Sequence, residues 1–274
     1  MHTGKCYNLE ILWQNAEYEK LLGPLLEQAI ANLTTYPSKN SPYEGRGPFS
    51  LIQTSPQQIF RIRPYLRGGW IRHLNRDLFW GSKRPYQEFR ISLQAYKSGI
   101  PTAEPIAGVV RKSPMGLGLY RGYWVSREIS NTKNLFHFLK SNPTFKKKRE
   151  SLSQVALAVR KMHDIGIFHA DLHLGNVLIQ EDGDPLPIYL IDFDRARIQS
   201  PLSEKDRKAN LIRFYRSAYK YPTIRTHFSA EDWKFFFQSY GLEPAAMKNV
   251  IKEGEQSVRK HALSWRFQRG AGSQ

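Results

Sequence analysis

Cysteine is almost absent from this chain: Cys6 is the single one among 274 residues. A lone cysteine excludes an internal disulfide framework and agrees with a reducing compartment. Long apolar runs are missing as well, and the N-terminus carries Asn8, Glu10 and Gln14 where a secretory signal peptide needs uninterrupted apolar residues. We therefore expect no membrane-spanning segment. The expected location is the cytoplasm or the cytoplasmic face of a membrane.

Acidic side chains are also scarce, with 24 Asp and Glu against 41 Lys and Arg, which gives a formal net charge of +17. Such an excess favours an anionic partner: nucleic acid, acidic lipid or a phosphorylated substrate. A basic surface that only keeps the protein soluble is the plain alternative. Hydrophobic residues make up 41% of the chain, which is enough for one large folded domain or two lobes.

The spacing of apolar residues predicts a strand-rich first half. Alternation with period two in 59–63 indicates a half-buried strand, paired with 49–53 in a hairpin with a glycine-bearing entrance. A helix is expected from Pro85 to Gly99, followed by two more strands at 106–110 and 117–125.

In the second half, the spacing of apolar residues predicts mostly helices, at 152–166, 209–219, 230–240 and 245–267. Short strands are expected at 177–180 and 188–191. Ser229 and Asp232 resemble a capping box. The basic run 146–149 is expected to be a solvated helix entrance. The fold class expected is α+β and two-lobed like a protein kinase: a strand-rich N-terminal lobe over 1–127, a helical C-terminal lobe over 128–274, and a nucleotide cleft between them.

Two short motifs carry the chemistry. The first is His169-Ala170-Asp171-Leu172-His173-Leu174-Gly175-Asn176, and the second is Leu190-Ile191-Asp192-Phe193-Asp194. Their spacing is that of the protein-kinase catalytic loop and its metal-binding Asp-Phe pair. Asp171 is the expected catalytic base, and Asn176 and Asp192 offer the hard oxygens that Mg²⁺ prefers near the phosphates of ATP. The plain alternatives are a turn-capping aspartate and a turn asparagine.

Other members of these motifs have less defined roles. We expect His169 to hold the loop by packing and hydrogen bonding. Asp194 is either a further metal or substrate contact or a helix cap. The sequence assigns no role to His173.

The candidate nucleotide-binding residues lie in the first half. Gly45 and Gly47 could let backbone amides approach phosphates closely. Arg63, near the end of its strand, is the candidate for gripping the phosphates, with Glu88 on the next helix as its partner; a surface ion pair is the alternative. The stretch Tyr65-Leu66-Arg67-Gly68-Gly69-Trp70 has Arg72, Arg76, Lys83 and Arg84 nearby. These cations could clamp carboxylate or phosphate groups, or the stretch could be an exposed basic loop without a ligand.

The chain resembles the lipopolysaccharide kinases, in particular the 3-deoxy-D-manno-octulosonic acid (Kdo) kinases, from about Gly45 to Trp233. The matching pieces are Gly45-Arg46-Gly47, Ile62-Arg63-Pro64-Tyr65-Leu66-Arg67-Gly68-Gly69, Asn75-Arg76-Asp77, Tyr86-Gln87-Glu88-Phe89, Gly99-Ile100-Pro101-Thr102-Ala103-Glu104-Pro105-Ile106-Ala107, His169-Ala170-Asp171 with Asn176, Ile191-Asp192-Phe193-Asp194-Arg195 and Asn210-Leu211-Ile212-Arg213. Two departures are Pro64, which replaces a usual histidine, and Leu66, which interrupts a more basic stretch.

The resemblance implies a kinase that uses ATP and Mg²⁺ to phosphorylate the 4-hydroxyl of a Kdo residue on a lipid A precursor, in the synthesis of the lipopolysaccharide inner core. It also implies an arginine in place of the usual kinase lysine, which matches Arg63. The expected location is the cytoplasmic side of the inner membrane, reached through a basic surface without a spanning helix. Kdo carries a carboxylate and lipid A carries phosphates, so a cation-rich acceptor face has a chemical reason to exist.

Three other functions are compatible with parts of the sequence. A kinase of the same fold could act on heptose or another small hydroxyl acceptor, such as an aminoglycoside. A catalytically silent kinase fold could serve as a binding scaffold, although it would leave Asp171, Asn176 and Asp192 idle. A nucleic-acid-binding protein is suggested by charge alone and is not expected, because no nucleic-acid motif is present. The sequence assigns neither an oligomeric state nor a role to residues 1–42.

Overall fold

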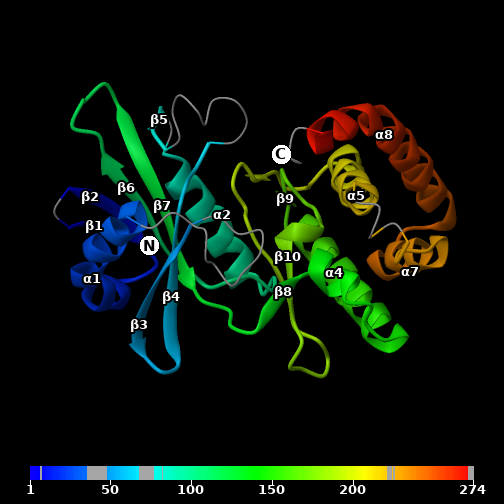
Figure 1. The fold of residues 1–274 in the computed structure, drawn as a ribbon, viewed down its shortest axis with the longest axis horizontal. Helices are drawn as coiled ribbons and strands as arrows, with labels where there is room; N and C mark the ends of the chain where they lie inside the picture. The colour runs from blue at the N-terminus through cyan, green and yellow to red at the C-terminus, as the bar shows by residue number, and fades with distance from the viewer. Residues whose placement is uncertain are drawn as a thin grey trace. The chain divides into compact units, whose positions relative to one another are not determined.

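The computed structural model describes residues 1–6, 8–35, 48–67, 77–81, 83–220, 224 and 226–270. It consists of two compact units: unit 1 comprises Met1–Lys97 and Ala103–Ile129, and unit 2 comprises Ser98–Thr102 and Ser130–Gln274. Strands dominate the first unit and helices the second (Figure 1), which confirms the expected α+β class.

Unit 1 is built on an antiparallel sheet whose strands run in the order β1-β2-β6-β7-β4-β3, with β5 paired to β7. Their bounds are His2–Cys6 for β1, Leu9–Trp13 for β2, Ser50–Ser55 for β3, Gln58–Pro64 for β4, Phe79–Trp80 for β5, Pro105–Lys112 for β6 and Leu119–Arg127 for β7. The predicted hairpin is formed by β3 and β4, and the two later predicted strands are β6 and β7.

The two helices in the described part of unit 1 cover opposite faces of this sheet. Successive side chains of a strand point to opposite faces, and Val109 accordingly belongs to the apolar cluster of helix α1 (Ala16–Thr35), whereas Val110 belongs to that of helix α2 (Arg84–Lys97). Gly108 lets α2 approach the sheet closely, because a Cβ there would lie 2.6 Å from the carbonyl oxygen of Pro85. The predicted helix at 85–99 is therefore confirmed.

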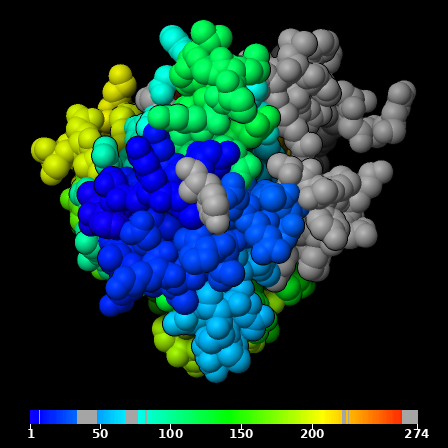
Figure 2. Space-filling view, turned by 90° about the vertical axis from the view of Figure 1, so that its left-hand side faces the viewer, coloured from blue at the N-terminus to red at the C-terminus, as the bar shows by residue number. Residues whose placement is uncertain are grey.

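The N-terminal segment, to which the sequence assigned no role, completes unit 1. Strand β2 pairs with β6, and α1 buries Leu22, Leu26 and Ile30 in the core. In Figure 2 this segment forms most of the blue surface that faces the viewer. Strands β1 and β2 were not expected. Strand β1 is largely exposed and has no apolar alternation, whereas β2 is short and buried apart from Glu10.

Unit 2 contains a three-stranded sheet and a set of packed helices. The sheet has the order β11-β10-β8, and a second strand pair is formed by β9 and β12. The strand bounds are Thr132–Asn134 for β8, Ile167–Phe168 for β9, Val177–Gln180 for β10, Ile188–Leu190 for β11 and Arg197–Ile198 for β12. The helices are α3 (Leu135–Lys140), α4 (Phe145–Asp164), α5 (Glu204–Tyr219), α7 (Ala230–Tyr240) and α8 (Pro244–Gly270).

Helices α4, α5 and α7 form the core of unit 2 from apolar faces. Within the predicted helix at 152–166, the apolar stripe Leu152, Val155, Val159 and Met162 of α4 is fully buried. Helix α7 contributes Trp233, Phe236 and Phe237, and α8 packs along α5 (Figure 1). The predicted capping box of Ser229 and Asp232 is present at the start of α7.

The basic run 146–149 is more than a solvated helix entrance, so that prediction was wrong in part. Lys148 forms an ion pair with Asp232, a buried residue of α7, and the guanidinium of Arg149 lies 4.4 Å from the ring centroid of Phe235. Lys148 and Asp232 are 84 positions apart in the chain (232 minus 148), so a local sequence pattern does not reveal their contact.

Candidate active site

Asp171 lies in the turn that follows β9, with its carboxylate accessible: 56% of the side-chain surface is exposed. One carboxylate oxygen, Oδ1, accepts a hydrogen bond from Nη1 of Arg213 at 3.0 Å. The other, Oδ2, lies 3.4 Å from Nε2 of His173. The contact with His173, followed by the charge of Arg213, lowers the pKa of Asp171 below its usual value. The carboxylate is thus held in its ionised form, as a proton acceptor must be.

The tautomer of His173 follows from its second contact. Its Nδ1 atom accepts the backbone N–H of Gly175 at 2.9 Å, so in the neutral ring the proton sits on Nε2. That proton faces Asp171. His173 therefore orients the carboxylate of Asp171 from within the same loop.

Asn176 is buried and is bonded to the loop that carries Asp171. Its Nδ2 atom donates to the backbone carbonyl of Asp171 at 2.9 Å. Because this bond uses the amide nitrogen, the oxygen Oδ1 is the atom of the side chain that suits a cation. The same bond fixes the spacing between Asp171 and Asn176.

Asp192 stands at the same end of a strand pair as Asn176. Strands β10 and β11 pair antiparallel with Val177 opposite Leu190, and the N–H of Ile191 donates to the carbonyl of Asn176 at 3.0 Å. Asp192 follows with φ at +67°, in the left-handed region that non-glycine residues rarely adopt. Strain of this kind is concentrated at functional sites, where the surrounding structure imposes it.

His169 joins the two motifs from inside unit 2. It is fully buried; its Nδ1 accepts the N–H of Asp171 at 3.2 Å, and its Nε2 donates to the carbonyl of Ile191 at 3.0 Å. Burial lowers the pKa of His169, so the ring is neutral, as these two bonds require. The ring thereby sets the position of Asp171 relative to the residue before Asp192.

Asn210 of α5 clamps the backbone of His169. Its Oδ1 accepts the N–H of His169 at 3.0 Å and its Nδ2 donates to the carbonyl of the same residue at 2.8 Å. Nε2 of His163 donates to the same Oδ1 at 3.1 Å, and Nδ1 of His163 accepts from the hydroxyl of Tyr240 at 2.8 Å. This buried network, Asn210–His163–Tyr240, anchors the loop 169–176 to three helices, α5, α4 and α7. Spacing alone gives no sign of this network, and only the family resemblance points to Asn210 and Arg213.

Arg63 and Glu88 form the expected ion pair in unit 1. Nη2 of Arg63 donates to Oε1 of Glu88 at 2.6 Å, and the hydroxyl of Tyr65 donates to Oε2. The Glu88 side chain is 1% exposed, whereas that of Arg63 is 29% exposed. The pair therefore differs from an exposed surface pair, and part of the Arg63 side chain stays accessible. Its use toward a nucleotide stays a prediction.

Several other predicted residues are placed differently or lie outside the described residues. The residues outside the described part of the chain are Gly45, Gly47, Gly68, Gly69, Arg72 and Arg76. Arg67 donates to the carbonyl of Leu78 at 2.9 Å, and Lys83, expected in an anion clamp, pairs instead with Glu10. Asp194 is half-buried next to the buried Phe193.

The donor set of unit 2 fits a magnesium ion. Within the described part of the chain, no group of three or more His, Cys, Asp or Glu side chains could hold a metal by itself. Mg²⁺, however, is commonly bound by one or two carboxylates together with substrate phosphates and water. Asn176 and Asp192 supply an amide oxygen and a carboxylate of this kind at one end of the β10–β11 pair. We also find that no helix among the described residues is long and apolar enough to cross a bilayer.

Comparison with known proteins agrees with this geometry. The family model "Lipopolysaccharide kinase (Kdo/WaaP) family" matches residues 41–240. The chain belongs to this family. The predicted resemblance is therefore confirmed, and the protein is a kinase.

Individual relatives support the assignment over most of the chain. The 3-deoxy-D-manno-octulosonic acid kinase of Mannheimia succiniciproducens is 30% identical over 210 residues, which cover 72% of this chain and 82% of the relative. The enzyme of the same name from Vibrio cholerae serotype O1 is 31% identical over 177 residues, covering 63% and 70%. A solved structure, "WaaP in complex with acyl carrier protein", is similar with a TM-score of 0.61 and 19% identity, covering 91% of this chain and 98% of that one. The kinase-like fold is thus confirmed.

Proposed function

We propose that this protein transfers the γ-phosphoryl group of ATP to the 4-hydroxyl of a Kdo residue on a lipid A precursor. The observation that carries the proposal is the gathering of Asp171, Asn176 and Asp192 by two bonds, from Asn176 to the carbonyl of Asp171 and from Ile191 to the carbonyl of Asn176. The acceptor is inferred from the relatives, which are named for Kdo.

In the proposed reaction, Asp171 accepts a hydrogen bond from the acceptor hydroxyl and takes its proton as the oxygen attacks the γ-phosphorus. The bond between that phosphorus and the β–γ bridging oxygen breaks, and ADP leaves. His173 and Arg213 hold the carboxylate of Asp171 ionised and oriented. Asn176 and Asp192 would hold Mg²⁺, which when bound would neutralise charge on the β- and γ-phosphates.

The nucleotide phosphates would be gripped from unit 1. Arg63 has the guanidinium for this, held in place by Glu88 and leaving about a third of its side chain exposed (29%). Charge-assisted hydrogen bonds from a guanidinium to phosphate oxygens are among the stronger ones in proteins. Gly45 and Gly47 remain proposed phosphate contacts.

The proposal is tested by offering a panel of acceptors to the purified protein with labelled ATP and weighing the products. The panel contains a Kdo-bearing lipid A precursor, a heptose-bearing precursor and an aminoglycoside, each with Mg²⁺ and with a chelator. We expect one phosphate on Kdo, and only when Mg²⁺ is present. Transfer to heptose or the aminoglycoside alone would contradict the proposed acceptor, and failure to bind Mg²⁺-ATP would indicate a silent scaffold.

We further propose that the protein works at the anionic cytoplasmic face of the inner membrane as a peripheral protein. The formal charge of +17 supports this, since each basic side chain near an anionic surface adds roughly 1 kcal/mol of attraction. Binding to vesicles of anionic lipid should weaken steeply from low to high salt. Binding that does not change with salt would contradict an electrostatic mode.

A further inference from the structure

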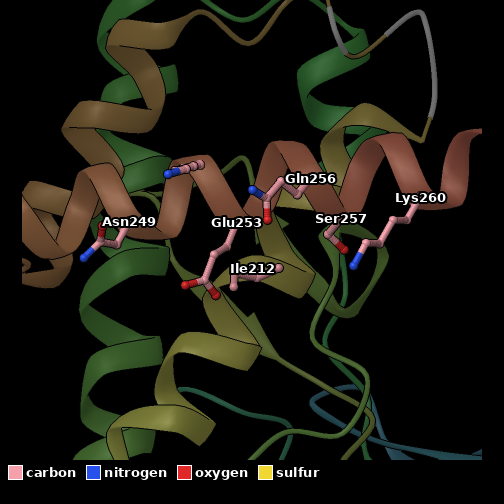
Figure 3. A pocket seen from close by; sticks show the side chains of 7 residues that line it. Ile212, Asn249, Glu253, Gln256, Ser257 and Lys260 are labelled. Carbon is pink, nitrogen blue, oxygen red and sulfur yellow. The ribbon is translucent and has the colours of Figure 1, made fainter.

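An open groove of about 550 Å³ lies between α5 and α8 in unit 2 (Figure 3). Helix α8 supplies most of its lining from positions that recur on one face of the helix, and Ile212 of α5 contributes its floor. The polar residues of the lining are Asn249, Lys252, Glu253, Gln256, Ser257 and Lys260.

The lining carries cations that the protein itself does not neutralise. Lys252 and Lys260 are exposed and form no ion pair within the described part of the chain, nor does either amide, Asn249 or Gln256, form a side-chain hydrogen bond there. Among the described residues of the lining, the carboxylate is that of Glu253, which accepts a hydrogen bond from Nζ of Lys208 at 2.9 Å. The groove is therefore positive overall and lined by groups that donate hydrogen bonds.

Helix α5 connects this groove to Asp171. Arg213 contacts Asp171 at 3.0 Å, and Arg216, one turn further along α5, donates to the hydroxyl of Ser257 in the groove at 3.0 Å. Three residues advance a helix by roughly 4.5 Å, so the two arginines are neighbours. Burial and the nearby charge of Arg213 lower the pKa of Arg216, in agreement with this proximity. A row of cationic side chains thus leads from the catalytic carboxylate into the groove.

We propose that the groove between α5 and α8 binds the phosphate-bearing saccharide of the acceptor, beyond the sugar whose hydroxyl reacts at Asp171. This inference rests on the proposed function, in which the acceptor is a sugar on a phosphorylated glycolipid. Lysine ammonium groups bind phosphate as point charges, and amides and hydroxyls exchange hydrogen bonds with sugar hydroxyls. A volume of about 550 Å³ lies within the range of ligand sites, and the polar lining suits a sugar rather than an acyl chain.

The test compares two variants that remove the same charge from the same helix. The groove variant is Lys252→Ala with Lys260→Ala. The control variant is Lys248→Ala with Arg259→Ala, because both of these residues are exposed on α8 and neither lines the groove. Binding of a Kdo-bearing lipid A precursor is measured by calorimetry in neutral detergent micelles, with its dephosphorylated counterpart as the second ligand.

We expect the groove variant to bind the phosphorylated precursor roughly tenfold more weakly than the unchanged protein, and the control variant to differ by less than about twofold. The preference for the phosphorylated over the dephosphorylated ligand should shrink in the groove variant. Equal weakening in both variants would show long-range attraction only and would overturn the inference, as would no weakening in either. Because this measurement needs no turnover, it is separate from the proposed function, which fails if the unchanged protein binds the precursor but does not phosphorylate it.

Discussion

The two units each contain a carboxylate on which the proposed chemistry depends, and they treat it in opposite ways. Glu88 of unit 1 is 1% exposed and is held by the side chains of Arg63 and Tyr65. Asp171 of unit 2 is 56% exposed and is flanked by Arg213 and His173. A carboxylate that only orients an arginine can be sealed from water, whereas one that must reach a substrate hydroxyl has to stay accessible.

The supports of the two carboxylates differ as well. Glu88 lies on a long helix and is fixed by packing and by two side-chain donors. Asp171 lies in a turn, and its position is set through the backbone: by Asn176 at its carbonyl, by His169 at its N–H, and behind these by Asn210. We therefore expect changes at Glu88 to act on stability and nucleotide binding, and changes at Asp171 to act on turnover.

The largest expected effect is on catalysis at Asp171. Asp171→Asn keeps the size of the side chain but removes the proton acceptor, so kcat should fall by roughly 10²- to 10⁴-fold. Steady-state kinetics with the Kdo-bearing acceptor measures this, and the midpoint of urea unfolding serves as the control for folding. Turnover at the unchanged rate would show that Asp171 is not the base.

Loss of the buried carboxylate should cost stability in unit 1. Glu88→Ala removes the buried carboxylate to which Arg63 and Tyr65 donate. The free energy of unfolding should therefore fall by roughly 3–4 kcal/mol. The matched control is Lys133→Ala, which breaks an exposed pair with Glu181 at 2.6 Å and should change the free energy of unfolding by less than about 1 kcal/mol. Equal effects in urea titrations of the two variants would mean that the Arg63–Glu88 pair behaves as a surface pair.

The hydrogen bonds of Asn210 to the backbone of His169 should contribute somewhat less to the free energy of unfolding than Glu88 does. Asn210→Ala leaves the buried N–H and carbonyl of His169 without their partner, which should destabilise the protein by roughly 2–3 kcal/mol and lower kcat. Ser217→Ala is the control on the same helix, since it removes a single acceptor from the N–H of Leu174. If both variants unfolded at the same urea concentration, the two bonds of Asn210 to His169 would stabilise the protein no more than the single bond of Ser217 does.

The smallest expected effect is a dependence of stability on pH. Burial lowers the pKa of His163 to about 4, from 6.5, so the folded protein binds this proton less well than the unfolded chain. The contribution of the neutral ring is present above pH 6.5 and is lost as the pH falls toward 4, which amounts to about 2 kcal/mol between pH 7 and pH 5. Urea titrations of the protein and of His163→Gln should show a shallower pH dependence in the variant; parallel curves would contradict this.

Much of the fold could be predicted from sequence because local periodicity determines it. The alternation in β4, the apolar stripe of α4 and the capping box of α7 each lie within a few consecutive residues. Strand β1 could not be predicted, because an exposed edge strand needs no apolar alternation. The pair of Lys148 and Asp232 joins two helices far apart in the chain, and no local pattern encodes it.

The candidate site was predictable to the same extent. Asp171, Asn176 and Asp192 lie in two compact motifs, and the pairing of β10 with β11 brings their ends together. Arg213 and Asn210, which contact this loop from 42 and 41 positions away, depend on how α5 folds back onto it. The role of His173 required the position of its ring, because the bond from Gly175 decides which nitrogen carries the proton.

The equilibrium affinity for Mg²⁺-ATP, measured side by side for Arg63→Ala and Asp171→Asn, tests most directly whether the two units divide binding and chemistry. Loss of the guanidinium should weaken nucleotide binding by roughly tenfold or more, because charge-assisted bonds to phosphate are lost. Asp171→Asn should bind the nucleotide as the unchanged protein does. Unchanged affinity in Arg63→Ala, together with a large loss in Asp171→Asn, would contradict the account.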